Sequence, residues 1–139
     1  MTATWSRIEP MDEDESMRML QSVWWGRCAW SGPSGPRILP VNHAVVDGDV
    51  VFRTGLHGTL ADATEAADGS PVAFEVDELD DRLAWGWSVV VLGRAEQVQD
   101  HAEVEALFRR LPEPWATGLR PVLVRIVPTE VTGRRFSRS

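Results

Sequence analysis

The stretch that decides the fold is Val45-Val46-Asp47-Gly48-Asp49-Val50-Val51-Phe52-Arg53-Thr54. Asp47-Gly48 separates two β-branched runs, and a two-residue type I′ turn needs positive φ at both central positions, which this pair adopts readily. The pattern predicts a tight β-hairpin whose second strand ends in Arg53 and Thr54. A glycine-containing loop and a short helix, expected at residues 60–67, follow. Backbone N–H groups at that helix start, beside Arg53, favour an anion site, and a solvated strand-end arginine is the alternative interpretation.

The composition indicates a single acidic domain, residues 1–139, expected to be soluble and cytoplasmic. A formal net charge of -7 leaves no basic face for nucleic acid or an anionic membrane, so neither partner is expected. Cys28 is the one cysteine and cannot form an internal disulfide, and the N-terminus lacks a secretory pattern. Every one of the 14 basic residues is arginine, which removes lysine from any mechanistic role.

Other segments extend the hairpin into a mainly β domain with short helices. Asp12, with Glu15 three residues later, predicts the cap of a first helix. The Gly- and Pro-rich residues 31–36 predict a turn. Further strands are expected at 25–30, 38–46, 49–54, 72–76, 87–98 and 121–132, and a further helix at 102–110.

The longest expected strand contains an apolar run, Val89–Leu92, without alternation. An antiparallel sheet normally turns one face to water, so this run predicts that one face fills a barrel and the other meets a helix or a second subunit. The seven tryptophans point the same way, because most are expected to anchor the core or a dimer interface.

Four segments carry a resemblance to a known family, and they are Leu39–Val45, Val51–Gly55, Val72–Glu78 and Gly86–Glu96. Their order and spacing, over about residues 12–135, resemble the pyridoxamine 5′-phosphate oxidase-like, FMN-binding split-barrel family. The resemblance implies a homodimer of six-stranded antiparallel Greek-key barrels, with FMN in clefts at the subunit interface.

The same resemblance assigns cofactor contacts. Arg53 and Thr54 would meet the flavin ring edge and phosphate, and Val41 and Asn42 would lie beneath the ring. The remaining contacts would come from the phosphate turn, Gly58, Thr59 and Leu60, and from the second subunit through Trp87 and Ser88. His57, in the glycine-containing loop, is a further candidate for phosphate contact or acid–base chemistry, and an exposed loop histidine is the alternative.

Two positions depart from the family pattern. Thr59 lies where the family commonly has a phosphate-binding lysine, and His43 lies where it commonly has a tyrosine. Loss of one cation from a phosphate site costs about 1.5–3 kcal/mol.

The expected function is that of an FMN-dependent oxidoreductase acting on a small organic molecule. One alternative is a reductase that uses a deazaflavin coenzyme, whose anionic tail would meet Arg27, Arg37 or Arg120. The other is a cofactor-free binding or structural protein that has lost the flavin, which the missing lysine favours. The sequence names no catalytic acid or nucleophile.

The remaining candidates for metal binding or reactivity are expected to have structural roles. No His, Cys or Asp spacing matches a metal motif, so no metal site is expected. The acidic residues of segment 75–81 are expected to form a solvated turn between strands, with cation binding as the alternative. Cys28 is expected to be a small apolar residue of a buried strand, with a redox function as the alternative.

Overall fold

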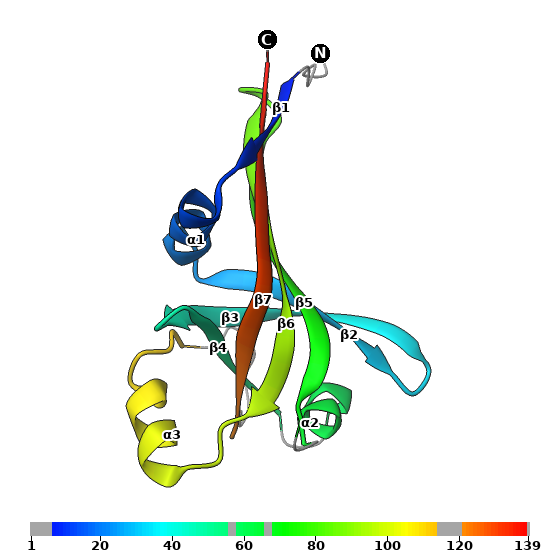
Figure 1. Ribbon diagram of the computed structural model, residues 1–139, viewed down its shortest axis with the longest axis vertical. Helices are drawn as coiled ribbons and strands as arrows, with labels where there is room; N and C mark the ends of the chain where they lie inside the picture. Colours follow the sequence, from blue (N-terminus) through cyan, green and yellow to red (C-terminus); the bar gives the residue numbers. More distant parts are fainter. Residues whose placement is uncertain (1–6, 56–57, 66–67, 114–120, 139) are drawn as a thin grey trace.

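The computed structural model describes residues 7–55, 58–65, 68–113 and 121–138, which form seven strands and three helices (Figure 1). The strands are β1 (Arg7–Met11), β2 (Trp25–Gly32), β3 (Gly35–Val46), β4 (Asp49–Thr54), β5 (Ser70–Asp80), β6 (Trp85–Gln97) and β7 (Val122–Ser137). The helices are α1 (Glu13–Ser22), α2 (Thr59–Thr64) and α3 (His101–Phe108).

The strands form one antiparallel sheet that closes on itself. The order is β1-β7-β4-β3-β2-β5-β6, and an additional β6–β7 pairing closes a six-stranded barrel. The predicted split-barrel fold class is confirmed, with β1 as an unexpected seventh strand. β1 pairs with residues 133–137 of β7, beyond the part of β7 that pairs with β4. Figure 1 shows β7 running the length of the molecule, so that its second half, β1 and the end of the β5–β6 hairpin extend beyond the barrel.

The hairpin around Asp47 and Gly48 has the predicted geometry. Asp47 and Gly48 have φ values of 51° and 85°, and β4 begins and ends at the expected residues. The predicted turn at 31–36 is too long, because the strands continue to Gly32 and resume at Gly35, which has a φ of 115°. Beyond Trp30, β2 has no β5 partner, so the β2–β3 hairpin projects from the barrel (Figure 1).

The alternation along β6 separates the barrel interior from an uncovered face. Val89 and Val91 are fully buried inside, whereas Leu92 is 42 % exposed and points outward. One face of β6 therefore fills the barrel, as predicted. The other face is open to solvent at Leu92 in the single chain. Pairing is shifted between Leu92 and Gly93, where a Cβ atom would collide with the carbonyl oxygen of Val127.

Element ends differ from prediction where long-range pairing decides them. β7 continues past residue 132 to Ser137 because β6 and β1 supply partners for its second half. α3 ends at Phe108 rather than 110, and α2 ends at Thr64, with residues 66–67 outside the described part of the chain. Of the tryptophans, Trp30 and Trp87 are buried and Trp24 and Trp85 are exposed. Trp5 and Trp115 lie outside the described residues.

Helix α1 is capped as predicted and packs against β3 and β7. The Asp12 carboxylate accepts a hydrogen bond from the Glu15 backbone N–H at 2.8 Å. At the other end, His43 Nε2 lies 3.2 Å from the Leu20 carbonyl oxygen, and the ring packs edge-on against Phe74. Burial lowers the pKa of His43, against the opposing effect of that hydrogen bond. The neutral imidazole therefore links α1 to the barrel.

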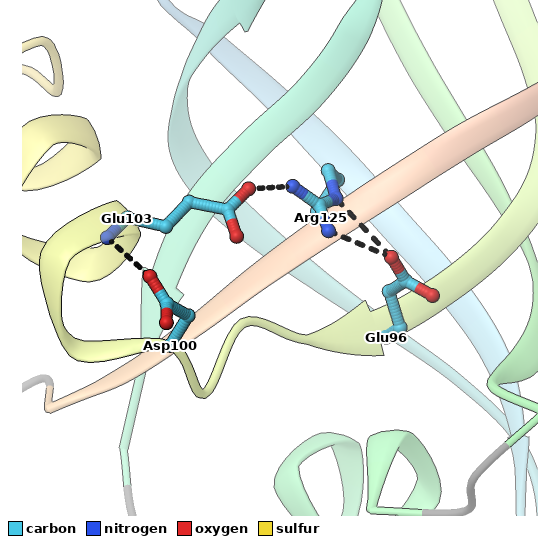
Figure 2. Close-up of polar contacts among 4 residues, drawn as sticks. All are labelled: Glu96, Asp100, Glu103 and Arg125. Carbon is cyan, nitrogen blue, oxygen red and sulfur yellow. Dashed lines mark hydrogen bonds and ion pairs between the residues drawn. The ribbon is translucent and has the colours of Figure 1, made fainter.

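Helix α3 is tied to the barrel by one arginine (Figure 2). Arg125 on β7 donates to Glu96 on β6 at 3.0 and 3.2 Å and pairs with Glu103 on α3. Asp100 caps α3 by accepting from the Glu103 backbone N–H at 3.0 Å. The helix covers a second small core that includes Val51.

Gly133 is required where α1 crosses β7. A Cβ atom there would collide with Ser16 Oγ and lie 2.6 Å from Met11 Cε. We expect Gly133→Val to lower the free energy of unfolding by about 1–3 kcal/mol, the usual cost of overpacking. Chemical denaturation followed by tryptophan fluorescence measures it.

Gly55→Val is the matched control, because a Cβ atom at Gly55 meets nothing within 4 Å. Equal losses of stability in the two variants would contradict close α1–β7 packing as the cause.

Candidate functional site

The strand register places one row of side chains across five strands. Pro40, Arg27, Glu75, Val90 and Thr132 lie opposite one another on β3, β2, β5, β6 and β7. They belong to the surface that we call the open face, made of Arg27, Ala29, Ile38, Pro40, Asn42, Ala73, Glu75, Asp77, Ser88, Val90, Leu92, Thr132 and Arg134. Helix α1 packs on the opposite side of β7, where Arg135 pairs with Glu15.

Strand alternation and burial divide most of the predicted cofactor residues into two groups. Asn42 and Ser88 lie on the open face. Arg53 also points to the outer side of the barrel, because Phe52 and Thr54 on either side of it are buried, and β4 adjoins β3 at the edge of the open face. The other group points into the core, with exposed fractions of 8 % or less: Val41, Thr54, Leu60 and Trp87. Any cofactor contact from these four positions would come from the backbone, and all of these assignments stay predictions.

Arg53 is positioned by α3. Its guanidinium carbon lies 5.0 Å from the centroid of the Phe108 ring, and the side chain is partly buried. Among the described residues, no carboxylate pairs with Arg53. A planar, weakly hydrated cation with free donors is suited to a phosphate group.

The predicted phosphate turn leads into α2, and a side chain of the barrel holds that helix in place. Gly58 precedes α2 and makes no side-chain cap, and a Cβ atom there meets nothing within 4 Å. The Gln97 side chain donates to the Ala61 carbonyl at 2.8 Å and so fixes the helix on β6. Thr59 is partly buried at the first position of α2. His57 lies outside the described residues.

Ser88 lies between two hollows of the outer surface. A groove of about 480 Å³ is lined by Glu75, Asp77, Leu79, Asp81, Ser88 and Phe136. A second hollow of about 320 Å³ is lined by Ile8, Pro10, Ser88, Val90, Thr132, Gly133 and Arg134. The groove is within the size range of small-molecule sites.

The open face carries a charged group whose contacts were not predicted from the sequence. Arg27 pairs with Glu75 at 2.8 Å and with Asp77 at 3.4 Å. Burial, a hydrogen bond with Asp77 and its negative charge raise the pKa of Glu75 to about 7, although Arg27 acts in the opposite direction. The expectation of a solvated turn is wrong for most of this segment, because β5 continues to Asp80. The alternation of apolar Phe74 and Val76 with acidic Glu75 and Asp77 is a strand pattern, and it could have predicted that the two carboxylates share the outer face.

The three arginines expected to meet a deazaflavin tail have different environments. Arg27 is engaged by two carboxylates, and Arg37 is exposed on β3. Arg120 lies outside the described residues. Within the described ranges, no three His, Cys, Asp or Glu side chains gather in a way that could hold a metal ion. None of the described helices combines the length and apolarity needed to cross a membrane.

Comparison with known proteins identifies the family. Residues 12–135 match a family model described as pyridoxamine 5′-phosphate oxidase. The uncharacterized protein Rv0080 of Mycobacterium tuberculosis is 45% identical over 131 residues, which cover 93% of this chain and 86% of that protein. The chain therefore belongs to the pyridoxamine 5′-phosphate oxidase family, as the resemblance predicted.

Solved structures share the whole fold. The FAD binding protein from Mycobacterium smegmatis is 34% identical and has a TM-score of 0.74, covering 91% of this chain and 97% of that one. A FAD-binding protein from Mesorhizobium loti has a TM-score of 0.77 over 94% of this chain and 99% of that one. At 22% identity, the second likeness shows the fold alone.

Cys28 is predicted to be chemically inert in the folded protein. Its side chain is fully buried, and burial raises the pKa of the thiol to about 12. Because the thiolate is the reactive species, we expect a chromogenic disulfide reagent at pH 8 to give no fast reaction with folded protein. The same reagent should titrate one thiol per chain after unfolding in guanidinium. Rapid reaction of the folded protein would contradict a purely structural role.

Proposed function

We propose that two copies of this chain associate through the open face and hold a flavin nucleotide, FMN or FAD, at its Arg53 edge. The pair would act as an oxidoreductase on a small organic molecule. The observation that carries the proposal is an uncovered face that contains Asn42 and Ser88 and has Arg53 at its edge, an arginine with no carboxylate partner within the described part of the chain.

The exposure of apolar side chains supports a second copy as the partner. Ile38 is 67 % exposed and Leu92 is 42 % exposed, and Val90 lies next to Leu92 on the same face of β6. Contiguous apolar surface of this kind marks interaction sites in soluble proteins. In a symmetric dimer the open face of one copy would pack against the open face of the other, so that both are buried in one interface.

The phosphate end of the cofactor fits the residues present. Arg53 has no carboxylate partner among the described residues, and its guanidinium lies over the Phe108 ring. FMN and FAD both carry a phosphate on the ribityl chain, so this contact does not discriminate between them. FMN follows from the resemblance in sequence, and FAD is supported by the name of the M. smegmatis protein at 34% identity.

A bound flavin supplies the two-electron chemistry, and the chain contributes binding, orientation and exclusion of water. Arg53 would orient the phosphate. The apolar side chains of the open face would exclude water from the ring when a second copy covers them. A deazaflavin coenzyme has less support, because Arg27 is already engaged by Glu75 and Asp77.

The proposal is tested by titrating the purified chain with FMN, FAD, riboflavin and a deazaflavin coenzyme, followed by flavin fluorescence, with light scattering in parallel. We expect saturable binding of FMN or FAD at one site per chain and twice the mass of one 15.5 kDa chain. Preference for the deazaflavin coenzyme would select the first alternative. Failure to bind any of the four would select the cofactor-free protein.

Arg53→Ala isolates the phosphate contact. We expect the variant to lose about tenfold or more in affinity for FMN or FAD, the scale of one charge-assisted hydrogen-bonded contact. Riboflavin, which lacks the phosphate, should bind both proteins alike. Arg37→Ala is the matched control, because it removes an exposed arginine from β3. An equal loss for riboflavin would show that Arg53 supports the ring or the fold instead.

A further inference from the structure

The centre of the open face carries a charge imbalance. One guanidinium, that of Arg27, serves two carboxylates, those of Glu75 and Asp77, at 2.8 and 3.4 Å. With both carboxylates ionised the group has a net charge of minus one, and with one of them protonated it is neutral. Glu75 lies in the middle of the five-strand row, between Arg27 on β2 and Val90 on β6.

The surroundings of Glu75 do not remove this imbalance. Arg27 on β2 and Asp77 on its own strand contact Glu75, and Asp81 in the turn after β5 lines the same groove. On β7, exposed Glu130 lies opposite Leu92 and adds another negative charge to the same face. Arg134 on β7 lies beyond Ser88 and has its guanidinium carbon 5.9 Å from the Phe136 ring centroid. The groove that Glu75 and Asp77 line therefore adds a third carboxylate rather than a second cation.

Building on the proposed dimer, we infer that association of two copies across the open face takes up one proton at Glu75 of each copy, so that dimer stability falls as the pH rises through neutrality. Covering the face removes water from the Arg27–Glu75–Asp77 group. A neutral group tolerates this at modest cost, whereas two groups of net charge minus one would be desolvated and brought together.

The protonation behaviour of the single chain supports this direction. The pKa of Glu75 is raised to about 7, so below that pH the carboxyl is neutral and donates a hydrogen bond to Asp77, and above it the carboxyl is ionised. Further desolvation in a dimer disfavours the ionised form again and raises the pKa of Glu75 more. By linkage, a state in which the pKa is higher binds more protons and loses stability as the pH rises.

The test is sedimentation equilibrium of the full-length chain at fixed ionic strength between pH 6.5 and 8.5. We expect the dimer dissociation constant of the natural sequence to rise by about tenfold or more across this range, because two protons are coupled to each association. Glu75→Gln mimics the protonated side chain and should give a tight dimer whose dissociation constant is nearly independent of pH.

Glu78→Gln is the matched control. It removes the same charge from the same strand, but Glu78 is exposed on the other side of β5 and should leave the pH dependence unchanged. A dimer with a constant dissociation constant, or a Glu75→Gln dimer with the natural pH dependence, would overturn the inference and leave the proposed function intact. A monomer at every pH would overturn the proposed dimer as well.

Discussion

The long backbone ladder between β6 and β7 is the interaction on which the rest of the structure depends. It joins residues 85–97 of β6 to residues 124–137 of β7 and closes the barrel. β7 can then pair with β4 along its first half and with β1 along its second. The ladder also provides the surfaces that the helices need, since α1 crosses β7 at Gly133 and α3 is held to β7 by Arg125. Without closure, neither helix would have a defined docking surface.

Closure of the barrel also determines which side chains lie on its outer surface. A closed barrel turns alternate side chains inward, where Phe52, Phe74 and Val91 fill it, and leaves the others outside. Helix α3 covers one part of that outer surface, and the open face is a part that stays uncovered. Arg53 lies where the two parts meet, which explains how one side chain can be partly buried by Phe108 and still keep its donors available.

The open face combines features that are unfavourable in an isolated chain. Exposed Ile38 and Leu92 favour association, while the unbalanced carboxylates beside Arg27 oppose it unless a proton is bound. The same surface would exclude water from a flavin ring if a second copy covered it. Association, proton binding and cofactor binding are therefore three expected consequences of one uncovered patch of sheet.

The sequence by itself determined the features that depend on local geometry and alternation. The Asp47-Gly48 turn, the Asp12 cap and a barrel filled by one face of the Val89–Leu92 strand were all predicted, because φ preferences, side-chain hydrogen bonds and apolar runs involve near neighbours. The family was predicted from the order and spacing of four segments. Only the tertiary structure decided the length of β7, the existence of β1 and the contact between Arg27 and Glu75. Each of these depends on strands distant in the chain meeting in one register, and one-residue shifts of register would turn the same side chains to opposite faces.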